Sequence, residues 1–228
     1  MPPPAQERWV ILAGIPNVLK DKEAERIIPP GADISVAGSD FPRASVLTVP
    51  YRVSSPPCYD YPYVAAVDSS GLLLLCSTEP DGVYFAIYTY HLCDARTGEA
   101  VRLGDHDEAM GRHGRNAGLM VRDGSCMVAE LQPTGDGATL LCYDVGKKHK
   151  WVQKKLVLSP PPHDKWCGEG VVSDGAMLWW VDTRHGLLGC DPFADEPELL
   201  HVLLPPVPDQ LPIDTANRGA YHCVKMSG

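Results

Sequence analysis

Hydrophobic positions along the chain occur in short runs that turn-forming residues separate. Examples are "GLLLLC" at residues 71–76 and "AMLWWV" at residues 176–181. Such runs, bounded by Gly, Pro, Asp and Ser, are typical of β-strands. Helical periodicity is rare: "DKEAERII" at residues 21–28 predicts a short helix that the following two prolines would end. The pattern therefore predicts an all-β protein with very little helix.

Three segments of the chain share one plan of turns and strands. Each has a polar turn ending in glycine, an apolar strand, a second turn, and a second strand ending in cysteine with an aspartate within two residues. The glycines are Gly71, Gly124 and Gly175, the cysteines Cys93, Cys142 and Cys190, and the aspartates Asp94, Asp144 and Asp191. The period of about 50 residues is close to that of kelch-type propeller blades.

The repeat predicts a propeller-like array of about four antiparallel β-sheet blades, in the style of kelch and F-box-associated repeats. We expect a single domain over residues 8–228, preceded by a disordered N-terminus at residues 1–7. The approximate units are 8–67, 68–117, 118–168 and 169–215, with the start of a further unit at 216–228. Because these units nearly exhaust the chain, we expect the array to be open or incomplete, with an exposed edge near its C-terminal end.

The repeat gives structural roles to several conspicuous residues. An aspartate at the end of a strand can accept hydrogen bonds from N–H groups of the turn that follows. In the third segment, Met177–Val181 is expected to be an inner strand, with Trp179 and Trp180 facing opposite sides because side chains alternate along a strand. In the second segment, Trp151 opens the strand after the turn and is expected to supply packing area.

Composition and charge narrow the class of protein. Of the 228 residues, 44% are hydrophobic and 21% are charged, as in a soluble globular protein. A net charge of −9 argues against a nucleic-acid partner, and we interpret the lysine cluster at residues 146–155 as a solvated turn and strand. No apolar run is long enough to span a membrane, and the N-terminus has no signal-peptide pattern.

Cysteine usage bears on the cell compartment. Most of the eight cysteines lie in or beside apolar runs. This placement favours reduced, buried thiols in a cytoplasmic or nuclear protein over a disulfide framework.

Four stretches of the sequence resemble a plant family, domain of unknown function 1618, which is expanded in grasses. They are "WVILAGIPNVL", "CDARTGEAVRL", "WVDTRHGLLGCDPF" and "ANRGAYHCVKMSG", and the resemblance covers roughly residues 8–228. It implies a mostly β, propeller-like architecture related in style to F-box-associated domains. It implies no established enzymatic activity and no catalytic residues.

The sequence gives only weak signals of a metal site or a catalytic nucleophile. His163 and Cys167, His185 and Cys190, and His222 and Cys223 lie near one another in sequence, but the chain has no C-x2-C pair of the kind that structural zinc uses. Burial explains the cysteines better, so we expect no metal and no cofactor. Cys167 is the candidate nucleophile, with His163 as its partner, and this pair would need spatial closeness and a lowered thiol pKa.

Other polar clusters also favour structural explanations. Asp105 and Asp107, and Asp195 and Glu196, are expected to be solvated turn residues. The glycines at residues 111–118 lack the spacing of a phosphate-binding loop, so that stretch is expected to be a long loop between two units. We therefore assign no catalytic residue.

These observations favour a non-catalytic protein-interaction module with an unknown protein partner. The alternative is a hydrolase or small-ligand-binding enzyme with a site on the propeller face, for which Cys167 would have to lie within hydrogen-bond reach of a histidine. The repeat leaves "TRHG" unexplained, since the other segments have different loops there. Thr183, Arg184 and His185 are therefore the candidate binding residues.

Overall fold

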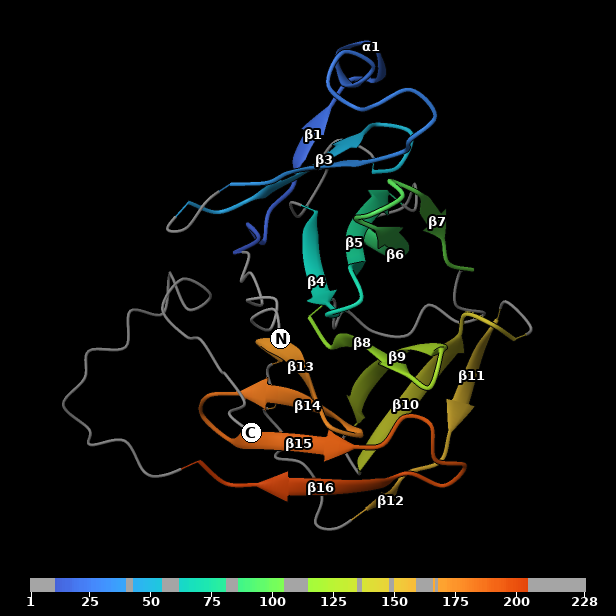
Figure 1. Ribbon diagram of the computed structural model, residues 1–228. Coiled ribbons are helices and arrows are strands. Elements are labelled where there is room, and N and C mark those ends of the chain that lie inside the picture. Colours follow the sequence, from blue (N-terminus) through green and yellow to red (C-terminus); the bar gives the residue numbers. More distant parts are fainter. Residues whose placement is uncertain are drawn as a thin grey trace, which may run out of the picture. The chain divides into compact units, whose positions relative to one another are not determined.

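The structure is a computed structural model (Figure 1). It describes residues 11–39, 43–54, 62–80, 86–104, 115–134, 137–147, 150–158, 166 and 168–204. Contacts between residues divide the chain into two compact units. Unit 1 comprises Met1–Val64 and Gly71–Arg102, and unit 2 comprises Ala65–Ser70 and Leu103–Gly228.

Unit 1 begins with a small three-stranded sheet and one turn of helix. Their bounds are Asn17–Leu19 for β1, Asp21–Ala24 for α1, Ser35–Ala37 for β2 and Val46–Pro50 for β3. The strand order is β1-β3-β2, with β1 parallel and β2 antiparallel to β3. The helix expected over residues 21–28 is thus confirmed only in its first half.

A four-stranded sheet follows along the chain. Its strands are β4 (Tyr63–Val67), β5 (Leu72–Pro80), β6 (Ala86–Asp94) and β7 (Ala100–Arg102), bonded in that order. β5 pairs antiparallel with β6, and β6 with β7. Leu73 and Leu75 of β5 and Cys93 of β6 pack with Leu47 and Val49 of β3, so both sheets contribute to the core of unit 1.

On the face of the β5–β7 sheet that contributes to this core, apolar side chains give way to polar ones from one cross-strand pair to the next. Leu73 lies opposite Cys93, and Leu75 lies opposite His91, which in turn lies opposite Arg102 on β7. His91 is only 6% exposed. Burial, with a smaller effect from Arg102, lowers the pKa of His91 from 6.5 to about 4, so its imidazole is neutral at pH 7.

Unit 2 contains two further meanders. The first consists of β8 (Ala117–Arg122), β9 (Ser125–Thr134), β10 (Gly137–Asp144) and β11 (Trp151–Lys154). The second consists of β13 (Gly170–Asp174), β14 (Met177–Asp182), β15 (Gly186–Cys190) and β16 (Glu198–Val202), with β12 (Val157–Leu158) added parallel to β16. In both meanders consecutive strands pair antiparallel.

The two sheets of unit 2 share one core, to which buried side chains of β9, β10, β14 and β15 contribute. Close approach is possible because β8 carries Gly118, where an added Cβ would lie 2.5 Å from Cγ1 of Val171 on β13. Trp180 is fully buried, and its indole N–H donates to the carbonyl oxygen of Asn116 at 2.6 Å. Trp179 is half-buried on the other face, which confirms the expected alternation.

The structure confirms that the three repeated segments fold alike. Gly71, Gly124 and Gly175 have φ of 93°, 76° and 56° and stand at the turns before β5, β9 and β14. A positive φ is the backbone conformation for which glycine is preferred. The three repeated cysteines, Cys93, Cys142 and Cys190, are each at most 3% exposed.

The aspartate corners are also confirmed. Asp94 accepts hydrogen bonds through Oδ1 from the backbone N–H groups of Arg96 at 2.7 Å and Thr97 at 3.3 Å. Oδ1 of Asp144 accepts from the N–H of Gly146 at 3.1 Å, and Oδ1 of Asp191 from the N–H of Phe193 at 2.8 Å. The same residue type thus closes the same turn three times.

The all-β class and the four sheets are therefore confirmed. Two details depart from a uniform set of antiparallel blades: β1 and β12 each pair in parallel. β4 precedes the expected unit start at residue 68 and is the first strand of its sheet. Among the described strands, β1 and β16 lie in different sheets, so no sheet joins the first strand to the last.

The corner interaction can be tested at Asp94. We expect Asp94→Ala to lower the free energy of unfolding by about 1 kcal/mol, because two turn N–H groups lose their acceptor. Asp94→Asn keeps an oxygen acceptor and should recover most of this loss. Glu99→Ala removes an exposed carboxylate from the same turn and serves as the matched control, with a change below about 0.5 kcal/mol. Equal effects of Asp94→Ala and Glu99→Ala in urea unfolding would contradict the corner's role.

The buried histidine predicts a pH dependence of stability. Its folded pKa lies below the unfolded value, so its contribution is complete above pH 6.5 and is lost as the pH falls toward about 4. Between pH 7 and pH 5 we expect the wild type to lose about 2 kcal/mol more than His91→Gln. Urea unfolding at both pH values measures the difference. Parallel pH dependence of the two proteins would show that His91 does not titrate as inferred.

Candidate functional site

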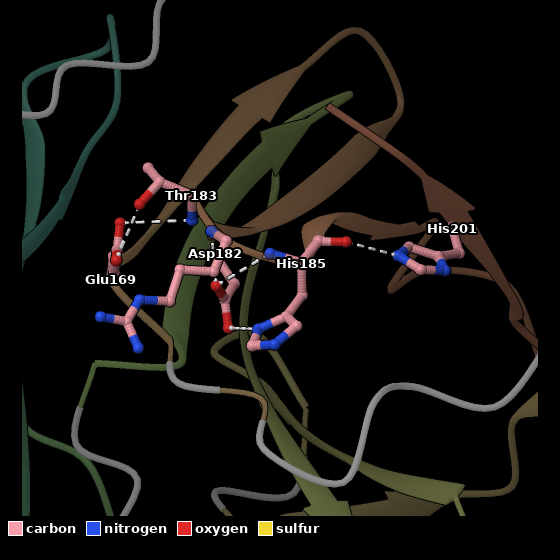
Figure 2. A network of polar contacts seen from close by, with 6 residues as sticks. Glu169, Asp182, Thr183, His185 and His201 are labelled. Atoms are coloured by element: carbon pink, nitrogen blue, oxygen red, sulfur yellow. Dashed lines mark hydrogen bonds and ion pairs between the residues drawn. The ribbon is translucent and has the colours of Figure 1, made fainter. Parts of the chain in front are cut away.

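The candidate residues Thr183, Arg184 and His185 form the turn between β14 and β15. The turn is organised by Asp182, the last residue of β14, which is fully buried. Its Oδ1 accepts hydrogen bonds from the backbone N–H groups of Arg184 at 2.9 Å and His185 at 3.2 Å (Figure 2). An aspartate therefore also fixes this turn, as at the three repeated corners.

The second carboxylate oxygen of Asp182 binds the ring of His185. The distance from Oδ2 to Nδ1 is 2.8 Å, and the His185 side chain is 20% exposed. Since a carboxylate only accepts, Nδ1 of His185 carries the proton. The carbonyl oxygen of His185 lies 2.9 Å from Nε2 of His201 on β16, so that nitrogen is a donor as well (Figure 2).

Glu169 holds the other side of the turn. The hydroxyl of Thr183 donates to Oε1 of Glu169 at 2.9 Å, and the backbone N–H of Thr183 donates to Oε2 at 3.4 Å (Figure 2). Glu169 directly precedes β13, and its own N–H donates to the carbonyl oxygen of Val181. The turn thus has supports from β14, from β16 and from the residue that precedes β13.

Close packing requires glycine directly after the turn. Gly186 has φ of 120°, and an added Cβ would lie 2.3 Å from the carbonyl oxygen of Val202. A substitution at Gly186 would strain the backbone and push β15 away from β16. The turn is therefore anchored at both of its ends.

Arg184 is the exposed residue of the turn. Its backbone N–H is bound to Asp182, while its guanidinium makes no hydrogen bond or ion pair with any residue that the structure describes. A guanidinium carries five N–H donors in a planar fork and remains charged at all physiological pH values. The turn therefore presents a positive, donor-rich group on a fixed backbone.

The structure brings the three residues predicted from the sequence together and adds three partners that the sequence pattern did not identify, namely Asp182, Glu169 and His201. Asp182 had a sequence signal, since it stands before a turn as the corner aspartates do. The other two lie far from the turn in sequence, and only the pairing of the strands places them there.

Thiol chemistry is disfavoured at four of the five described cysteines. Burial raises the pKa of Cys93 and Cys190 to about 12 and that of Cys126 and Cys142 to about 11. These thiols stay protonated at neutral pH, and the thiolate is the nucleophilic form. The five described cysteines form no disulfide.

Several residues singled out by their sequence patterns fall outside the described residues: His163, Cys167, His222, Cys223, Asp105, Asp107 and residues 111–114 of the glycine-containing stretch at 111–118. The required contact between Cys167 and a histidine thus stays a prediction. Asp195 and Glu196 are exposed, as expected. Within the ranges described, His, Cys, Asp and Glu side chains form no group suited to a metal ion, and no helix there has the length and hydrophobicity of a membrane span.

No protein-family model matches the chain, and no curated protein matches its sequence.

The turn predicts a strong effect at Asp182. We expect Asp182→Ala to lower the free energy of unfolding by about 3 kcal/mol, because several donors lose a buried acceptor. Asp182→Asn retains one oxygen and should fall between alanine and the wild type. Asp174→Ala, at an exposed aspartate of β13, is the control and should change stability by less than about 0.5 kcal/mol. Urea unfolding measures all four proteins, and a small effect of Asp182→Ala would refute the role assigned to its carboxylate.

Proposed function

We propose that this chain is a non-catalytic protein-interaction module of the β-propeller type, related to the plant family domain of unknown function 1618. The resemblance of the four sequence stretches supports the family, and the repeated four-stranded meanders support the type of module. Sheets of this kind hold their connecting turns rigidly, and binding residues are often found on such turns.

The turn that carries Thr183, Arg184 and His185 is the binding element. The observation that supports this role is a contrast within the turn: its backbone N–H groups are hydrogen-bonded, whereas the side chain of Arg184 is not bonded to any described residue. The N–H groups of all three residues are held by carboxylates, while the guanidinium of Arg184 is exposed and has no partner in the described part of the chain. A fixed backbone lowers the entropy that binding must overcome.

The chemistry of Arg184 suggests the kind of partner. Guanidinium groups bind carboxylates and phosphates in a bidentate manner and are enriched among residues that dominate interface energies. We therefore propose that the partner is a protein that presents an acidic side chain to this turn. The five cysteines that the structure describes are free, which is consistent with a reducing compartment, the cytoplasm or nucleus.

The test is capture of partners from plant extract with the wild type, Arg184→Glu and Arg115→Glu, followed by binding measurements with the purified captured protein. Arg115 is an exposed arginine of the same unit and provides the matched control. We expect Arg184→Glu to weaken binding at least about tenfold, because it replaces attraction with repulsion. Arg115→Glu should bind like the wild type.

Two results would contradict the proposal. One is a partner that binds the wild type and Arg184→Glu equally well. The other is hydrolysis of ester or peptide substrates by the purified wild type that is lost in Cys167→Ala, which would favour the alternative enzyme.

A further inference from the structure

Unit 1 contains a cavity of about 250 Å³ that the proposed interaction role does not use. Elements distant in sequence meet there: the loop before β2, the turn after β3, and strands β5, β6 and β7. Its polar lining residues are Asp33, Tyr51, Arg52, Glu79, His91 and Arg102. All of them belong to unit 1.

The walls of this cavity are held in place by close packing around Gly98. The N–H groups of Asp33 and Ile34 donate to the carbonyl oxygen of Gly98 at 2.8 and 2.9 Å. A Cβ at Gly98 would lie 2.7 Å from Cβ of Ala32, so the loop that carries Asp33 sits directly against the β6–β7 turn. Oδ2 of Asp33 also accepts from the N–H of Ala100 at 3.3 Å. The cavity is thus part of the fold of unit 1.

His91 lines this cavity and has unmet hydrogen-bonding capacity. The residue is buried, and its Nδ1 has no partner among the described residues. Buried polar atoms are nearly always bonded, so an unbonded one calls for an explanation such as a role in ligand binding. The imidazole is neutral, since burial lowers the pKa of His91 to about 4, and it can therefore both donate and accept.

The charged groups at the cavity are balanced and accessible. Nη1 and Nη2 of Arg102 lie 3.0 and 3.4 Å from the two carboxylate oxygens of Glu79, and Nη2 of Arg52 lies 3.4 Å from Oδ1 of Asp33. The four side chains are 33–45% exposed. Ion pairs with this exposure contribute little to stability, so a ligand can exchange with one member of a pair at small cost.

We propose that this cavity binds a small zwitterion, a free α-amino acid. Glu79 and Asp33 would repel a ligand that carries only negative charge. Arg52 and Arg102 would repel a ligand that carries only positive charge. A ligand that carries both charges complements the two ion pairs, because its carboxylate can bind a guanidinium and its ammonium group can bind a carboxylate. The volume equals that of roughly eight waters at ~30 Å³ each, so an amino acid with a short side chain fits in the cavity together with water.

The test is calorimetric titration of the full chain with glycine, L-threonine, L-valine, N-acetyl-L-threonine and L-threonine amide. We expect L-threonine to bind and each blocked derivative to bind at least about tenfold more weakly, because each lacks one of the two charges. L-Valine has the shape of L-threonine without its hydroxyl. If the hydroxyl bonds to His91, the preference for L-threonine over L-valine should disappear in His91→Leu.

Variants locate the site. Arg102→Gln and Arg52→Gln should each weaken L-threonine binding about tenfold, whereas Arg96→Gln, at an exposed arginine of the β6–β7 turn, should leave it unchanged. Thermal unfolding confirms that each variant is folded.

Three outcomes would overturn the inference. They are no binding of glycine, L-threonine or L-valine at about 10 mM, equal binding of either blocked derivative and L-threonine, or equal losses in Arg96→Gln and Arg102→Gln. None of these three outcomes involves Arg184, so the proposed interaction role is tested independently of the cavity.

Discussion

The structure of unit 2 depends on how closely its four-stranded and five-stranded sheets approach each other. Gly118 permits this approach, because its missing side chain leaves the space that Val171 occupies. Trp180 packs in the core, and its indole N–H, its one polar group, donates a hydrogen bond to the carbonyl oxygen of Asn116. Burying the apolar faces against each other removes them from water, which is the main driving force for folding. The turns can vary in sequence because they contribute little to this burial.

The same constraint explains why cysteine and aspartate recur together without forming a catalytic site. At each corner the cysteine side chain lies in the core and the aspartate lies at the strand end, where turn N–H groups need an acceptor. Burial that stabilises the thiol also raises its pKa, as at Cys190, and so removes its nucleophilic character. A sequence rich in Cys, His and Asp can therefore indicate turns and core rather than chemistry.

The sequence predicted the features that depend on neighbouring residues. The glycine turns and aspartate corners are local, and a period of about 50 residues made them recognisable. It did not predict β12, which has two residues and is held by its parallel partner β16. Nor did it predict that Glu169 supports Thr183 or that Arg102 lies opposite His91, because strand register decides both. Residues that meet only through register leave no pattern in a single sequence.

The turn and the cavity differ in which of their polar groups already have hydrogen-bond partners within the protein. That difference indicates different kinds of ligand. In the turn, Asp182 is fully buried and bonded on both oxygens, so the group left to act is Arg184 on the surface. A single exposed cation suits a macromolecule that supplies its own surrounding surface. His91 lines the cavity, and its buried Nδ1 has no partner among the described residues. The volume of the cavity limits the size of a ligand, and the ion pairs at its edge would select for charge.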